Sequence, residues 1–192
     1  MKLTDYFDRV VLLSLAHNEE RRKQALSGIQ ALDLGDPIHC RLAWHGDSLP
    51  APAWWRAGNG AWGCLQSHVR ALSEAWDAGA ERVLVLEDDV CWQPQAAEML
   101  EEFIGQVPGD WGQIYLGGQH QWTPEPVEGR PAVLLGVSIN RTHAYAVRRG
   151  TMPPLLAHVM HAPDYINSGH VRHIDHQLEV AHQRRDWRDR KS

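Results

Sequence analysis

Short apolar runs recur along the chain and alternate with stretches of mixed polarity. The first run, RVVLLSL from Arg9, consists of β-branched and leucine residues, which is typical of a strand buried on both faces. Comparable runs predict further strands at 40–44, 83–86 and 113–118, and two more at 132–139 and 143–149 around a turn. The segment 46–60 contains glycines and prolines that can continue neither a strand nor a helix, and it is predicted as a loop.

Between the predicted strands, apolar residues spaced three and four apart predict helices. The clearest case starts at Trp62, where Leu65, Val69 and Leu72 share one helical face and Gly79 ends the helix. Further helices are predicted over 25–34, into which the polar stretch 17–24 leads, from Pro94 to about 107, over 152–161 and near 175–185. Strands that alternate with helices predict an α/β fold: a mainly parallel, open, twisted sheet with helices on both faces.

Composition narrows the class of protein. The 192 residues suit a single domain over 1–192, and the stretch 183–192 is predicted as a flexible basic tail. A net charge of -5 excludes a nucleic-acid binder that depends on a basic face. No apolar run reaches the roughly 18 residues of a membrane helix, and the acidic N-terminus lacks a signal-peptide pattern, so a cytoplasmic protein is expected. The basic tail leaves open a peripheral contact with the inner face of the membrane.

Cysteine usage indicates neither a disulfide framework nor a zinc site. Cys40, Cys64 and Cys91 are widely spaced, odd in number and without a CxxC pair. Free thiols in a reducing compartment are therefore expected.

Three carboxylates directly follow one apolar run. Glu87, Asp88 and Asp89 end VLVL, at the edge where open α/β sheets bind ligands. Because side chains alternate along a strand, Glu87 and Asp89 are predicted to point to one side and Asp88 to the other. A hard divalent ion, Mg²⁺ or Mn²⁺, would remove their mutual repulsion. The alternative is an acidic loop that caps the following helix.

The segment from Gly58 to Val90 resembles the signature of glycosyltransferase family 25, which includes lipooligosaccharide-biosynthesis transferases and collagen galactosyltransferases. That signature combines Gly-Cys-x-x-Ser-His at a helix start with an apolar strand that ends in Glu-Asp-Asp. The matching residues here are Gly63, Cys64, Ser67, His68, Glu87, Asp88 and Asp89.

The similarity extends more weakly to both ends of the chain. Arg21 lies in the polar loop after the first strand, although Ser14 replaces the family's usual Asn and Ala16-His17 its common Asp-Arg. Tyr145 matches an Ala-Tyr strand, and Asp175 matches a Val-Asp-His-type element.

The resemblance implies a GT-A-like, nucleotide-sugar-binding fold and a metal-dependent glycosyltransferase. It implies inverting transfer of a sugar, typically galactose, from UDP-galactose or UDP-glucose to a saccharide or lipid-linked saccharide in lipopolysaccharide or surface-glycan biosynthesis. The implied metal ligands of Mn²⁺ or Mg²⁺ are Asp89 and Glu87, and Asp175 is the implied catalytic base. The implied donor-binding residues are Arg21, Ser67, His68, Glu87, Asp88 and Tyr145.

Each assignment has a structural alternative. Asp175 would also serve as a helix N-cap. Ser67 and His68 would also brace their helix through internal hydrogen bonds, and Trp54 and Trp55 are either a wall of the site or core residues. At the level of function, two alternatives remain: a degenerate transferase fold that binds nucleotide or carbohydrate, and a metal-dependent phosphohydrolase, for which no DxDxT-like or P-loop motif is present.

Overall fold

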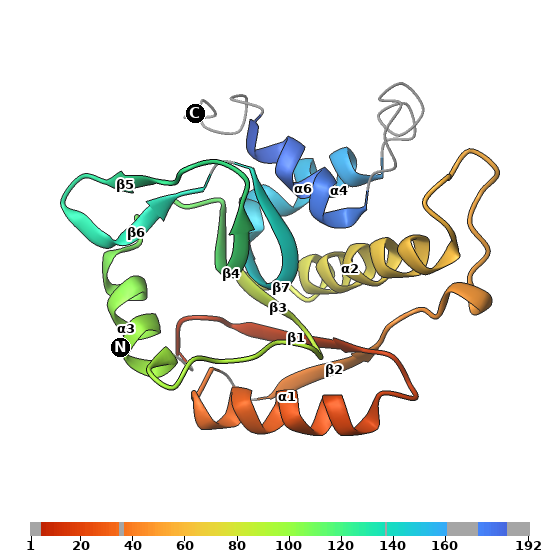
Figure 1. Ribbon diagram of the computed structural model, residues 1–192, viewed down its shortest axis with the longest axis horizontal. Helices are drawn as coiled ribbons and strands as arrows, with labels where there is room; N and C mark the ends of the chain where they lie inside the picture. The colour runs from red at the N-terminus through yellow and green to blue at the C-terminus, as the bar shows by residue number, and fades with distance from the viewer. Residues whose placement is uncertain (1–4, 35–36, 137, 161–172, 184–192) are drawn as a thin grey trace.

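A computed structural model describes residues 5–34, 37–136, 138–160 and 173–183. Its centre is a five-stranded sheet with the order β2-β1-β3-β7-β4 (Figure 1). The strands are β1 (Arg9–Ser14), β2 (Ile38–Leu42), β3 (Arg82–Glu87), β4 (Gln113–His120) and β7 (Ile139–Arg148). A separate two-stranded sheet pairs β5 (Glu125–Val127) with β6 (Arg130–Leu135).

The sheet is of mixed direction, which confirms the predicted α/β class only in part. β1 pairs in parallel with β2 and β3, whereas β7 is antiparallel to both β3 and β4. Four strands therefore run in one direction and β7 runs against them. The expectation of a mainly parallel sheet missed this reversed strand, because a strand's direction depends on its partner and not on its own apolar pattern.

Helices cover both faces of the sheet, as predicted. Figure 1 shows α2 (Asn59–Asp77), α4 (Met152–Val159) and α6 (Ile174–Gln183) above the sheet and α1 (Glu19–Ala31) below it. The lower layer also includes α3 (Ala96–Gln106), whose apolar side chains join those of α1 in one core. The described residues also form two short 3₁₀ turns, η2 (Gly46–Ser48) and η3 (Arg149–Thr151).

Alternation along the central strands divides the interior into two cores. In β3, Val83 and Val85 pack with α2, α4 and α6, while Leu84 and Leu86 pack with α1 and α3. All four side chains are fully buried, and each contributes about 1.5–3 kcal/mol by leaving water. This alternation also decides where the next residues of β3 point.

Several predicted boundaries differ from the structure. The strand predicted at 132–139 divides into β6, which is paired with β5 in the small sheet, and the beginning of β7. The segment 46–60 is a loop except for η2 and the first two residues of α2. The predicted tail, 183–192, lies outside the described residues apart from Gln183, which ends α6.

The three cysteines are free, as expected from their spacing. Among the described residues, no helix is both long and apolar enough to span a bilayer.

Candidate active site

The acidic triplet lies where β3 ends. Glu87 continues the series Val83 and Val85 toward α2, and Asp88 continues the series of even-numbered residues toward α1. The two side chains consequently have separate sets of partners, as the alternation predicted.

Glu87 is held by residues of α2 and β7. Its Oε1 lies 3.4 Å from Nε2 of His68 and accepts a short hydrogen bond from the Thr142 hydroxyl. Burial on its own would raise the pKa of Glu87, but His68, Thr142 and the charge of His143 hold it at about 2. Glu87 is therefore ionised throughout the neutral range.

His68 is the buried partner of that carboxylate. Its ring is 1% exposed, and its Nδ1 lies 3.0 Å from the Tyr145 hydroxyl. Burial alone would lower the pKa of His68, yet the Tyr145, Cys64 and Glu87 side chains raise it well above the usual value. A protonated imidazole beside Glu87 thus provides a fixed positive charge under the site.

Asp88 faces the loop after β1. Its Oδ2 accepts hydrogen bonds from the Ser14 hydroxyl at 2.7 Å and from the Asn18 amide at 3.2 Å. Its Oδ1 lies 2.6 Å from a guanidinium nitrogen of Arg21, and the same guanidinium lies 3.6 Å from Asp89. Arg21 is half exposed, so it neutralises the two carboxylates from the solvent side.

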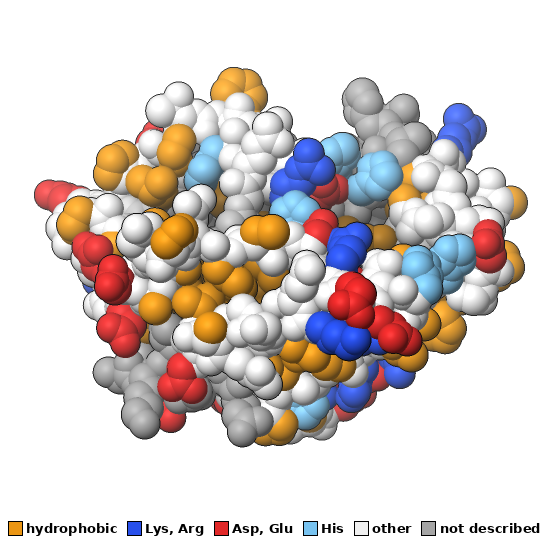
Figure 2. Space-filling view, turned by 60° about the horizontal axis from the view of Figure 1, so that its bottom comes forward, with side chains coloured by type: hydrophobic (Ala, Val, Ile, Leu, Met, Phe, Trp, Pro, Cys, Tyr) orange, Lys and Arg blue, Asp and Glu red, His pale blue; other side chains and the backbone are white. Residues whose placement is uncertain are grey.

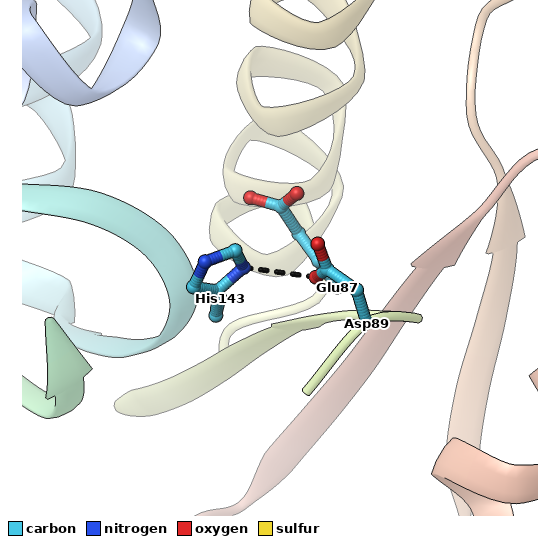
Figure 3. Close-up of side chains that lie close together, drawn as sticks. All are labelled: Glu87, Asp89 and His143. Atoms are coloured by element: carbon cyan, nitrogen blue, oxygen red, sulfur yellow. Dashed lines mark hydrogen bonds and ion pairs between the residues drawn. The ribbon is translucent and has the colours of Figure 1, made fainter. Parts of the chain in front are cut away.

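Asp89 and Glu87 converge with a histidine that the sequence did not single out. Asp89 Oδ1 lies 2.9 Å from Nδ1 of His143 on β7 (Figure 3). One ligand atom each from Glu87, Asp89 and His143 lies within 4.8 Å of the others. Two ligands of one ion at ~2.0–2.2 Å bond length are separated by at most about 4.4 Å, so small side-chain movements would make this set fit a metal ion.

The chemistry of this set selects among hard cations. Mg²⁺ takes oxygen ligands almost exclusively, whereas Mn²⁺ accepts carboxylate together with imidazole. Two carboxylates and one imidazole therefore fit Mn²⁺ better than Mg²⁺. Glu87, Asp89 and His143 are therefore a candidate set of metal ligands.

The Gly63 and Ser67 positions fix the start of α2 against the end of β2. A β-carbon at Gly63 would lie 2.5 Å from the Trp44 carbonyl oxygen, so only glycine permits this approach. One turn later, the Ser67 hydroxyl donates to the Gly63 carbonyl at 2.7 Å and accepts from the Trp44 amide at 2.8 Å. These contacts position His68, the next residue, under Glu87.

Comparisons of the sequence with known proteins point to one family. No family model matches the chain. It is 31% identical over 172 residues to the human inactive glycosyltransferase 25 family member 3, a match that covers 79% of this chain and 29% of that protein. This chain is therefore a relative of glycosyltransferase family 25.

Two other proteins of family 25 are similar to this chain at comparable levels of identity. Rat probable inactive glycosyltransferase 25 family member 3 is 30% identical over 172 residues, covering 79% of this chain and 30% of that protein. Mouse procollagen galactosyltransferase 2 is 29% identical over 147 residues, covering 67% of this chain and 23% of that protein. The chain spans less than a third of the length of these relatives.

The family 25 resemblance assigned donor contacts to residues that the structure buries. Ser67, His68 and Tyr145 are at most 4% exposed, and their polar atoms are engaged within the protein. The hydrogen bonds of Ser67 and His68 match the internal bracing that was the alternative for these two residues. Direct contact of these side chains with a donor stays a prediction, as it does for the more accessible Arg21.

Asp175, the family 25 candidate for the base, lies in the first turn of α6. Its Oδ1 accepts a hydrogen bond of 2.9 Å from the backbone N–H of His176, the next residue. The helix starts one residue earlier, at Ile174, so Asp175 is a first-turn acid and not the N-cap itself. Catalysis by Asp175 stays a prediction.

The loop tryptophans pack on one another. The rings of Trp54, Trp55 and Trp62 meet edge to face, with centroid distances between 5.2 and 6.2 Å. Trp55 is 8% exposed and its indole N–H donates to the Gly58 carbonyl at 2.8 Å. Trp55 is therefore a core residue, the second of the two roles considered for it.

Sequence reasoning missed His143 and Thr142. Both follow from the pairing of Leu86 with Ala144, which brings the beginning of β7 beside the end of β3. The sequence showed only that both residues lie just before Tyr145 in a predicted strand. It did not show the direction of that strand.

Proposed function

We propose that this chain is a metal-dependent glycosyltransferase that transfers a sugar, with galactose as the first candidate, from a UDP-sugar to a saccharide acceptor. The observation that carries the proposal is the convergence of Glu87, Asp89 and His143 at the end of β3. Relationship to family 25 supports glycosyl transfer as the class of reaction. The order of strands around this site is compatible with a GT-A fold formed by residues 1–192 as one domain, which belongs to the same proposal.

The proposed ion is Mn²⁺, held by Glu87, Asp89 and His143. When bound, such an ion supplies positive charge to a departing diphosphate. Arg21 is the second positive group at this position, because its guanidinium already lies against Asp88 and Asp89. We assign Arg21 to the donor phosphates, where its planar fork suits two oxygens.

The buried residues receive a positioning role in this proposal. Ser67 and Gly63 fix α2, and His68 and Tyr145 hold Glu87 in one orientation. A carboxylate whose position is fixed in advance loses less entropy on binding a ligand.

Asp175 is the proposed base for the acceptor. Its carboxylate would take the proton of the acceptor hydroxyl while that oxygen forms a bond to the anomeric carbon. The bond from the anomeric carbon to the diphosphate oxygen breaks on the opposite side, so the configuration inverts. The acceptor that we propose is lipopolysaccharide or another surface glycan, lipid-linked or free, modified in the cytoplasm or at the inner face of its membrane.

A second candidate is a degenerate transferase fold that binds a nucleotide or carbohydrate without turnover. The names of the human and rat relatives describe those proteins as inactive, which favours this candidate. The convergence of Glu87, Asp89 and His143 favours activity.

The test is calorimetric titration with UDP, UDP-galactose and UDP-glucose, each with Mn²⁺ and again with EDTA. Metal-dependent binding of a uridine nucleotide, followed by release of UDP on addition of an acceptor, is the expected result. Binding without UDP release under any acceptor tested would favour the binding module. Absence of binding to all three would reject a uridine-nucleotide donor.

A further inference from the structure

β7 forms a bulge beside the acidic triplet. Gly117 pairs with Ala144 and Gln119 pairs with Asn140, so a single residue of β4 lies opposite residues 141–143 of β7. Bulges redirect side chains and are frequent next to active sites. Two of the three bulged residues contact the carboxylates at the end of β3. The bulge is therefore part of the candidate site.

Arg141, the third bulged residue, has an unusual backbone conformation. Its φ is 83°, outside the range of about 50–70° in which left-handed helical residues lie. The φ values of Asp33 and Ser138, the other described non-glycine residues with positive φ, are 50° and 53° and lie inside that range. Glycine adopts a φ of 83° without steric cost, whereas a residue with a β-carbon is strained there. Since strained backbone clusters at functional sites, Arg141 is a candidate for a role in binding.

The charge of Arg141 is not neutralised by a neighbour. On the face shown in Figure 2, positive and negative side chains lie beside one another over the right half, and Arg21 and Asp88 are one such ion pair of this protein. Arg141 is exposed, and its guanidinium group has no hydrogen bond or ion pair with any residue that the structure describes. Its backbone N–H donates to the Asn140 side chain at 2.8 Å. A positive charge next to the site is consequently available for a ligand.

Arg141 and Arg21 flank the acidic triplet from opposite sides. Arg21 lies on α1, directly after β1, which pairs with one edge of β3, whereas Arg141 belongs to β7, which pairs with the other edge. The proposed base, Asp175, is also on the side of β7, because α6 packs against that strand. An acceptor that reaches Asp175 therefore approaches on the side where Arg141 lies.

We propose that Arg141 binds an oxyanion, a phosphate or a carboxylate group, carried by the acceptor saccharide. This inference rests on the proposed function, because that function places the acceptor at Asp175. A guanidinium group forms two parallel hydrogen bonds with either oxyanion, and such charge-assisted bonds are stronger than neutral ones. The acceptors of this chain are then acidic saccharides, which carry a phosphorylated sugar or a uronic acid.

The binding test uses glucose 6-phosphate, glucuronate and glucose, each titrated into the full chain at low salt with EDTA. EDTA removes metal ions, so the charged sugars cannot bind through them. At least one charged sugar should bind about tenfold more tightly than glucose or better, and its affinity should fall as salt rises. A preference for glucose 6-phosphate would identify a phosphate as the ligand, and a preference for glucuronate a carboxylate. Equal affinities for all three sugars would overturn the proposal.

Three variants locate the binding. R141Q should lose the difference between charged and neutral sugars, and R141K should recover part of it, because lysine restores the charge without the planar fork. R70Q is the control, since Arg70 is exposed and its partner Glu74 also pairs with Arg41 of β2, two strands away from β3. R70Q should bind like the wild-type chain. Full affinity of R141Q for the charged sugar would assign it to another cation and would overturn the proposal.

A glycine at the same position separates binding from a structural role. R141G should be at least as stable as the wild-type chain in urea unfolding, because glycine relieves the strain of the positive φ. It should also lose the binding of charged sugars, as R141Q does. A clear loss of stability in R141G would show that the side chain supports the fold, and would overturn its assignment to a ligand.

Titration with UDP and Mn²⁺ distinguishes failure of this inference from failure of the proposed function. Binding of charged sugars that depends on Arg141, in a chain that does not bind UDP, would reject the proposed function and keep the oxyanion site. Metal-dependent UDP binding, together with sugar binding that is the same in R141Q and wild type, would reject the oxyanion site alone.

Discussion

Replacing Glu87 with glutamine tests the interaction between the Glu87 carboxylate and the buried His68 imidazole. The substitution keeps the shape of the side chain and removes its charge, which leaves the buried His68 without a carboxylate partner. Glu87 is 26% exposed, so solvent screens the pair only in part. The measurement should be made with EDTA, so that metal binding does not contribute.

The size of the effect follows from the pKa of Glu87. A value of about 2 in the folded chain against an ordinary 4.5 corresponds to about 3 kcal/mol of stability at pH 7. Because the folded pKa is lowered, this stability is complete above 4.5 and is lost as the pH falls toward 2. At pH 3 about 1.5 kcal/mol should remain.

The contribution of His68 to the stability of the fold has the opposite dependence on pH. Its pKa is raised in the folded chain, so the stability from its protonation is present below 6.5 and is lost as the pH rises through the raised value. The free energy of unfolding of the wild-type chain should therefore decline at both ends of the pH range.

The assay is urea unfolding followed by tryptophan fluorescence at pH 7, 5, 4 and 3. E87Q should be less stable by up to about 3 kcal/mol at pH 7, and this difference should shrink toward pH 3. E98Q, which changes an exposed carboxylate on α3, should stay within about 0.5 kcal/mol of wild type. Parallel pH profiles for E87Q and the wild-type chain would refute the reasoning.

Three other substitutions test separate parts of the site. Asp89→Ala should abolish Mn²⁺-dependent UDP binding and leave the far-UV spectrum unchanged, and undiminished affinity with Mn²⁺ would remove Asp89 from the metal site. Asp175→Asn should keep donor binding and lose transfer, and a wild-type rate would return Asp175 to a structural role. Gly63→Ala should cost about 1–3 kcal/mol through its clash with Trp44, whereas Gly60→Ala, where a β-carbon meets nothing, should be neutral or stabilising; equal stabilities would contradict that packing.

Much of the site could be predicted from local pattern. The apolar run before Glu87 marks a buried strand, and strict alternation then separates Asp88 from Glu87 and Asp89 without knowledge of any partner. The helix that carries Ser67 and His68 is visible from its apolar spacing.

The parts of the fold and site that could not be predicted depend on contacts between segments far apart in the sequence. The direction of β7 follows from its pairing with β3, and only that pairing brings His143 to Asp89. The β5–β6 hairpin was missed because EPVEGR is short and contains a proline, although Gly129, with a φ of 69°, marks its turn.

The reversed strand also has a consequence for the order in which the chain matures. β3 pairs with β1 on one side, but its other edge remains open until β7 pairs with it. During synthesis, some sixty residues beyond Glu87 must leave the ribosome before that edge closes. A nascent chain that stops short of β7 would thus expose an apolar strand edge and three adjacent negative charges, so we expect the metal-binding set to be among the last parts of the sheet to assemble.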